Sequence, residues 1–185
     1  ATFRDMFLNE GRIAAQLTHP NICQVHDLGE DADGLYLAME YLEGVSWETF
    51  SEAMPRDATG TFLRLIAGML QQLAAGLGFA HNLRDAASGQ ATPVIHRDIS
   101  PQNVYLTVDG ICKVLDFGVA KVVTEGRRTR SGVVKGKLAY MAPEQLRGEP
   151  LDVRADIFAV GIVLWELLTG QLLFDRSTDF MVWQA

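Results

Sequence analysis

Apolar residues recur every three or four positions between Thr61 and His81. Because positions three and four apart share one face of an α-helix, this spacing predicts a long amphipathic helix packed on a core. Its apolar stripe consists of Phe62, Leu65, Ile66, Met69, Leu70, Leu73, Leu77 and Ala80. A second segment, from Asp156 to Thr169, is apolar on nearly every side, which predicts a buried helix with Gly170 as its carboxyl cap.

The amino-terminal part is predicted to contain one helix and two strands. Phe7, Ala14 and Leu17 have helical spacing, and the Thr-His-Pro-Asn sequence that follows ends the helix. Two β-rich runs come next and are joined by an acidic turn; the runs and the turn cover residues 22–28, 35–41 and 30–34. Glu43-Gly44 then breaks the pattern, so we expect a small unit at 1–42 and a mostly helical unit at 43–185.

A β-hairpin is predicted where two β-rich runs, Val104–Val108 and Ile111–Leu115, are separated only by Asp109-Gly110. Asp-Gly between such runs favours a two-residue type I′ turn, which needs positive φ at both central residues. In that register Val108 opposes Ile111, and counting back places Asn103 opposite Asp116.

This register has a chemical consequence. It would bring an amide oxygen and a carboxylate together at the open end of the hairpin, and oxygen ligands of this kind suit Mg²⁺. Asp98 enters the same end five residues before Asn103 and could accept the proton of an attacking hydroxyl. Taken alone, Asn103 and Asp116 could equally be ordinary polar residues at strand ends.

Bulk properties indicate a folded intracellular protein segment. The chain has 185 residues, of which 48% are hydrophobic and 21% charged, and this excludes a disordered chain. A net charge of −7 disfavours a general nucleic-acid binder. Cys23 and Cys112 lack metal-ligand spacing and are expected to be free thiols in a reducing compartment. Ile157–Trp165 is too short to span a bilayer and no signal peptide opens the chain, so we expect a cytoplasmic location, with a parent protein that could be membrane-anchored.

Three motifs occur in a fixed order: Val94–Asn103, Asp116-Phe117-Gly118 and Ala142-Pro143-Glu144. Together they resemble the catalytic loop, the magnesium loop and the activation-segment end of eukaryotic-type (Hanks-type) protein kinase catalytic domains, most closely those of bacterial serine/threonine kinases. The resemblance implies an α+β, kinase-like two-lobe fold, with a partial small lobe at 1–42 and a mostly helical large lobe at 43–185. It also implies ATP and Mg²⁺ as cofactors and a protein serine or threonine as substrate, with no nucleic-acid partner and no membrane segment.

The resemblance assigns roles to residues of the nucleotide site. Asp98 would be the catalytic base, and Asn103 and Asp116 would be the Mg²⁺ ligands. Glu10 would pair with a phosphate-binding lysine, although it could also be a solvated helical carboxylate. The hinge would be formed by Met39, which guards the pocket behind it, and by the backbone groups of Glu40 and Leu42, which would bind adenine.

Other residues would support or regulate the site. Asp156 would be the buried carboxylate that holds the catalytic-loop backbone, with a simple helix N-terminal charge as the alternative, and Glu144 would pair with an arginine. A phosphate in the segment after the magnesium loop could pair with Arg97 and order the loop. The candidate phosphosites are Thr124, Thr129 and Ser131, and the alternative is a flexible basic loop without a switch.

The catalytic loop departs from the family pattern at one position. Ser100 stands where these kinases usually have a lysine that steadies the transferring phosphate, and Lys137 stands where they usually have a threonine. We therefore expect Lys137 to supply the missing ammonium. The alternative is an exposed lysine that contacts substrate or solvent.

Two functions from different classes fit this sequence. An active kinase would use Asp98, Asn103 and Asp116, and a kinase-like scaffold would keep the fold and lose the chemistry. The intact trio favours the kinase. The chain begins within the segment that resembles the regulatory helix and shows no glycine-rich loop or strand lysine, and the later large-lobe helices are missing as well. We therefore expect it to be inactive as an isolated fragment.

Overall fold

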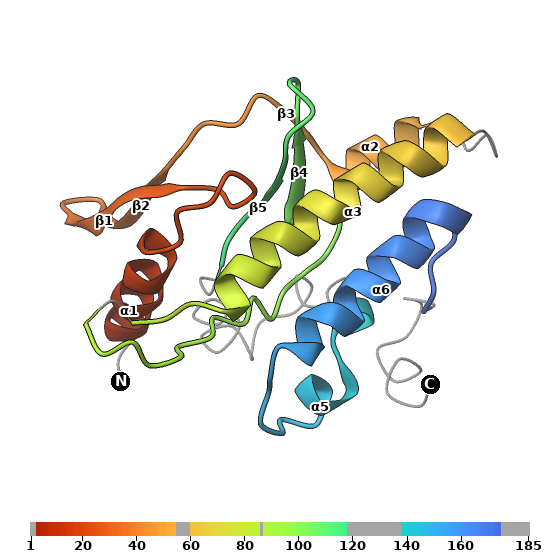
Figure 1. The fold of residues 1–185 in the computed structure, drawn as a ribbon. Helices are drawn as coiled ribbons and strands as arrows, with labels where there is room; N and C mark the ends of the chain where they lie inside the picture. The colour runs from red at the N-terminus through yellow and green to blue at the C-terminus, as the bar shows by residue number, and fades with distance from the viewer. Residues whose placement is uncertain (1–2, 55–59, 86, 118–137, 175–185) are drawn as a thin grey trace.

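The computed structural model describes residues 3–54, 60–85, 87–117 and 138–174 (Figure 1). Its amino-terminal part consists of helix α1 (Phe3–Ala15) and an antiparallel pair of strands, β1 (Val25–Asp31) and β2 (Gly34–Met39). The predicted helix and two strands are therefore present. The turn is tighter than expected, because β1 extends through part of the acidic segment and Asp31 pairs directly with Gly34.

The rest of the chain combines helices with a second, three-stranded sheet of order β3-β4-β5. The strands are β3 (Gly44–Ser46), β4 (Val104–Thr107) and β5 (Cys112–Val114). The helices are α2 (Trp47–Ala53), α3 (Gly60–His81), the 3₁₀ turn η1 (Leu138–Tyr140), α5 (Pro143–Leu146) and α6 (Arg154–Thr169). Both long helices agree with the predicted segments, and Gly170 caps α6 in a left-handed conformation at φ 69°.

The chain joins this second sheet directly at the predicted break. Gly44 begins β3 and pairs with Thr107 of β4. A Cβ atom at position 44 would lie 2.1 Å from the carbonyl oxygen of Leu106, so only glycine permits this close approach. The break at 43–44 is therefore a point where the chain packs tightly against the hairpin.

The predicted hairpin forms, but its predicted register is wrong by one residue. Val104 pairs with Val114 and Leu106 with Cys112, and the Thr107 N–H donates to the Ile111 carbonyl at 2.9 Å. The turn therefore has three residues, and only its last one, Gly110, takes a positive φ of 78°. Three-residue turns of this type are the next most common hairpin connection after the two-residue turns. As a result Asn103 opposes Leu115, whose N–H donates to its carbonyl at 2.9 Å, and Asp116 lies one residue beyond.

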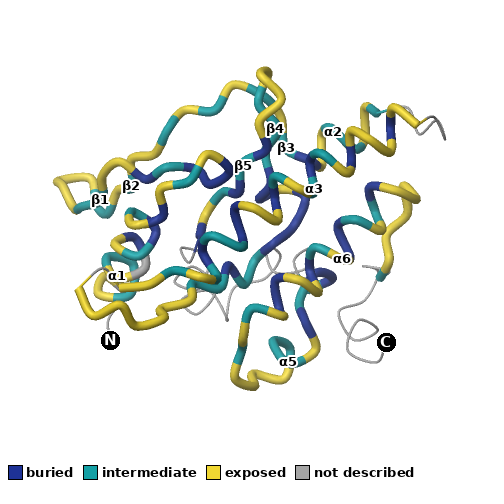
Figure 2. Tube along the Cα trace, in the orientation of Figure 1, coloured by how far each residue is buried: buried dark blue, intermediate teal, exposed yellow. Residues whose placement is uncertain are grey.

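A single core joins the second sheet to α3 and α6 (Figure 2). The apolar stripe of α3 is largely buried, as predicted, through Phe62, Ile66, Met69, Leu73, Leu77 and Ala80. Leu65 departs from this pattern and is 36% exposed. Among the described residues, α3 is the helix that is long and apolar enough to cross a membrane, which is weak evidence for a span, and its buried residues belong to this core.

Burial of α6 on nearly every side is not observed in the part of the chain that the structure describes. One face packs in the core through Ala159, Ile162, Val163 and Leu167. The opposite face is open, with Ile157 at 58% and Trp165 at 46% exposure.

Candidate active site

One buried carboxylate holds the backbone of the loop between α3 and β4. Asp156, in the first turn of α6, is 1% exposed. Its Oδ2 accepts the His96 N–H at 2.8 Å, and its Oδ1 accepts the Arg97 N–H at 2.8 Å. The His81 Nε2, at the end of α3, also donates to Oδ2 at 2.7 Å. Asp156 therefore connects α6, α3 and two consecutive loop amides.

The protonation of Asp156 follows from these contacts. Burial alone would raise its pKa, but the hydrogen bond from His81 and the two backbone N–H donors outweigh burial and lower it. The carboxylate is thus held in its charged form, in which both oxygens can accept hydrogen bonds. At Arg97 the backbone is in the left-handed region, with φ 68°. This conformation is costly for a residue with a side chain and needs fixed surroundings.

His96 connects the loop to the residue before Asp116. Its ring is buried, its Nε2 lies 2.7 Å from the Leu115 carbonyl oxygen, and its Nδ1 lies 3.2 Å from the Asp98 nitrogen. Because a carbonyl can only accept, the network assigns the proton to Nε2 and leaves Nδ1 to accept the Asp98 N–H. The ring also meets Phe117 edge-on at 4.7 Å. One imidazole thereby aligns the Asp98 backbone with the segment that carries Asp116.

Asp98 and Asn103 contact one another directly. The Asn103 amide nitrogen donates to the Asp98 carboxylate Oδ2 and to the Asp98 carbonyl, both at 2.7 Å. Since the amide nitrogen is used in this way, the amide oxygen is the atom that could serve as a metal ligand. Asn103 is 7% exposed, so its orientation is set by the fold.

Asp116 lines a small cavity at the end of β2. It shares this cavity with Met39, Cys23 and Phe117, together with Ala14, Ile22, Val25 and Leu37. Its backbone φ is 58°, in the left-handed region that is costly for a residue with a side chain. Among the described residues no three His, Cys, Asp or Glu side chains cluster as a metal site. The Asn103 amide oxygen and the Asp116 carboxylate are nevertheless oxygen donors of the kind that Mg²⁺ prefers, with phosphate and water as its other ligands.

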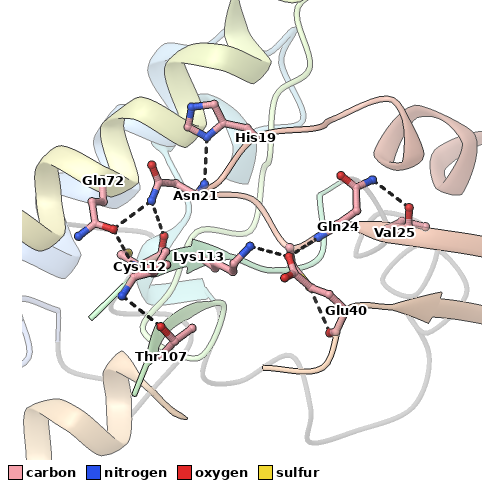
Figure 3. A network of polar contacts seen from close by, with 11 residues as sticks. His19, Asn21, Gln24, Val25, Glu40, Gln72, Thr107, Cys112 and Lys113 are labelled. Carbon is pink, nitrogen blue, oxygen red and sulfur yellow. Dashed lines mark hydrogen bonds and ion pairs between the residues drawn. The ribbon is translucent and has the colours of Figure 1, made fainter. Parts of the chain in front are cut away.

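Glu40, a predicted hinge residue, is held in place through its side chain (Figure 3). Its Oε1 accepts from Lys113 Nζ at 2.6 Å and from the Gln24 N–H at 2.7 Å. Its own N–H donates to the Gln24 carbonyl at 2.9 Å. Leu42 is half-buried, and Tyr41 between them is 91% exposed.

Several predicted site residues lie outside the described part of the chain. These are Lys137 and the three candidate phosphosites Thr124, Thr129 and Ser131. Glu10 lies within α1, but its side chain is outside what the structure describes. Glu144 is half-buried in the first turn of α5, and the next residue, Gln145, donates to the Arg97 carbonyl at 2.7 Å. The Ala-Pro-Glu motif is thus followed directly by a contact with the loop between α3 and β4.

Reasoning from the sequence alone missed four residues that organise the site: His81, His96, Lys113 and Gln145. A signal existed for His96, since a histidine directly after the apolar pair Val94-Ile95 predicts a buried polar side chain that needs partners. The other three are defined by contacts with distant segments and carry no local signal.

The family model for the protein kinase domain matches residues 2–184, so the chain belongs to the protein kinase domain family. The chain is similar to the Tyrosine-protein kinase MasK of Myxococcus xanthus (strain DK1622), at 48% identity over 183 residues, which cover 99% of this chain and 28% of MasK. It is also 35% identical to the Serine/threonine-protein kinase PrkC of Bacillus subtilis (strain 168), covering 93% of this chain and 24% of PrkC. The chain therefore spans about a quarter of the length of these relatives.

Solved structures agree with the family. A double mutant of the Mycobacterium tuberculosis PknI kinase domain matches with a TM-score of 0.69 at 29% identity, covering 94% of this chain and 60% of that one. These findings confirm the predicted Hanks-type kinase domain and its partial two-lobe α+β fold.

Proposed function

We propose that this chain belongs to a protein kinase that transfers the γ-phosphate of ATP to a serine or threonine hydroxyl. The contact between Asp98 and Asn103 carries this proposal, because it pairs a proton acceptor with a metal-ligand candidate. The backbone beneath them is held by Asp156, so the carboxylate is positioned before substrate arrives. A scaffold would have no need to keep this arrangement.

In the proposed reaction the hydroxyl oxygen forms a bond to the γ-phosphorus while the bond from phosphorus to the ADP oxygen breaks. The hydroxyl proton passes to Asp98. Bound Mg²⁺ would neutralise charge on the phosphates, and the residues that would hold it are Asn103 and Asp116. The backbone of Glu40 and Leu42 would hold adenine, with Met39 at the inner wall of the pocket.

An assay for transfer of the labelled γ-phosphate of ATP by the full-length protein distinguishes a kinase from a scaffold. Wild type should phosphorylate a general protein substrate, and Asp98→Asn should lower turnover by about 10²- to 10⁴-fold, the range of a lost general base. Asp109→Asn, on the exposed hairpin turn, is the matched control and should leave turnover unchanged. Absence of transfer by the wild type at saturating MgATP would favour the scaffold.

The acceptor hydroxyl is the finer question, since one relative is named a tyrosine kinase and others serine/threonine kinases. We propose serine and threonine, on the resemblance of the motifs to bacterial kinases of that class. Phosphoamino-acid analysis of the reaction product decides it. If the product contains phosphotyrosine and no phosphoserine or phosphothreonine, the proposal is wrong and the protein is a tyrosine kinase, as the name of MasK says of that relative.

The ammonium that Ser100 cannot supply is proposed to come from Lys137. Ser100 is 1% exposed and its Oγ is buried with no hydrogen-bond partner among the described residues, so it is poorly placed to contact phosphate. A lysine on a flexible stem can reach a phosphate from another backbone origin.

Arg97 is the proposed receiver of an activation-segment phosphate. Its Nε is buried without a hydrogen-bond partner in the described part of the chain, and an unpaired buried donor favours an incoming acceptor. We also propose that the domain acts in the cytoplasm, where ATP is supplied.

A further inference from the structure

Lys113 has no part in the proposed reaction, yet it occupies the joint between the hairpin and the hinge. It lies in β5, three residues before Asp116, and its Nζ donates to Glu40 Oε1 at 2.6 Å (Figure 3). The two side chains are only 13% and 24% exposed. Water and salt therefore screen this pair less than an exposed pair such as Arg4–Glu30, where the exposures are 56% and 46%.

The carboxylate that Lys113 holds also completes the end of the β1–β2 ladder. The register of this ladder shifts between Val25 and Asp27, and regular pairing stops at Met39. Beyond that point Gln24 and Glu40 exchange two hydrogen bonds, one between backbone groups and one from the Gln24 N–H to Oε1. The Glu40 side chain thus takes the place of a main-chain acceptor, and the same carboxylate oxygen is bonded to Lys113.

Strand β5, which carries Lys113, is also hydrogen-bonded to the segment that precedes Gln24. The Cys23 N–H donates to the Val114 carbonyl at 2.8 Å, and the Val114 N–H donates to the Asn21 carbonyl at 2.9 Å. The Cys23 Sγ also lies 3.9 Å from the Glu40 carbonyl oxygen. Cys23 lines the same small cavity as Asp116, so the Glu40 backbone and Asp116 face one region of the molecule.

We propose that Lys113 is a positioning residue for adenine. By holding the Glu40 carboxylate it fixes the orientation of the Glu40 backbone, whose carbonyl would accept the adenine amino group. The inference rests on the proposed function. Because the Lys113 ammonium is bonded to Glu40, it acts on the base of the nucleotide through the hinge and does not act on the phosphates.

This role predicts a specific pattern of binding and turnover in the full-length protein. Lys113→Met should weaken the binding of MgATP and of adenosine by the same factor. The factor should be on the order of tenfold, as expected for one lost charge-assisted hydrogen bond. The KM for ATP should rise similarly, with kcat within about twofold. Lys113→Arg should restore affinity, and Glu40→Gln should reproduce the loss in part because it keeps an acceptor for Gln24. Arg4→Met, which removes an exposed pair of the same length, is the matched control and should change none of these values.

Binding of the two ligands to wild type tests the proposed kinase function, and the comparison with Lys113→Met tests the role of Lys113. Adenosine and MgATP dissociation constants are measured by calorimetry, with circular dichroism to verify folding. If wild type binds neither ligand, the kinase proposal fails. If wild type binds both and Lys113→Met binds both equally well, the positioning role fails alone. If Lys113→Met weakens MgATP binding and leaves adenosine binding unchanged, Lys113 acts on the phosphates. If the variant raises kcat at constant KM, the Lys113–Glu40 pair restrains a motion of this segment. Either result overturns the inference. If Lys113→Met does not fold, Glu40→Gln supplies the same comparison.

Discussion

Replacing Asp156 by asparagine should strongly destabilise the domain. In the native fold this side chain accepts three hydrogen bonds, from the His96 N–H, the Arg97 N–H and His81 Nε2. Asparagine has one acceptor oxygen, and its NH₂ group would face a donor. At least one buried N–H would lose its acceptor, which costs about 1–3 kcal/mol of folding free energy. Loss of the charge that strengthens the remaining hydrogen bonds adds to this cost. We expect a loss of about 3 kcal/mol, a large share of the roughly 5–15 kcal/mol of a typical domain.

The effect should depend on pH in a defined direction. Because the pKa of Asp156 is lowered on folding, its contribution is fully present above the unfolded pKa of about 4 and is lost as pH falls through the folded value. The difference between wild type and Asp156→Asn should therefore stay constant from about pH 5 to 8 and shrink below about pH 4.

Urea unfolding followed by circular dichroism at several pH values measures this difference. Asp152→Asn is the control, since Asp152 is four residues away, 52% exposed and paired with Arg154 on the surface. Equal loss of stability for the two variants at neutral pH would refute the reasoning. A difference that grows as the solution becomes more acidic would refute the assigned direction of the pKa shift.

Three further predictions concern turnover and reactivity in the full-length protein. Lys137→Thr should lower kcat on the order of 10²-fold, and adding Ser100→Lys should restore much of it; intact turnover in the single variant would contradict the compensation. Alanine at the three candidate phosphosites together, 124, 129 and 131, should lower kinase activity, and unchanged activity would remove the proposed switch. Burial raises the pKa of Cys23 to about 11 and that of Cys112 to about 12, so a thiol reagent at pH 8 should label both only after unfolding; rapid labelling of the native protein would contradict their burial.

Elements with a strong local pattern could be predicted from the sequence. Helices α3 and α6 follow the predicted segments closely, because helical periodicity and a left-handed glycine cap are properties of neighbouring residues. The open face of α6 was not predictable, since its apolar composition does not say which side has a partner. The hairpin was predicted but its register was not, because Asp109-Gly110 fits both a two-residue turn and the last two positions of a three-residue turn.

In the candidate site, too, some residues could be predicted from the sequence and others could not. Asp98, Asn103 and Asp116 can be found from the sequence because their chemistry is concentrated in short motifs. Their alignment depends on contacts between distant segments: Asp156 reaches the His96 backbone across 60 positions, and Lys113 reaches Glu40 across 73. A hydrogen bond needs both partners within about 3 Å, and only the packing of the helices and the hairpin brings such residues that close. The sequence by itself therefore determined which residues carry the chemistry, and the tertiary structure decided which residues hold them in place.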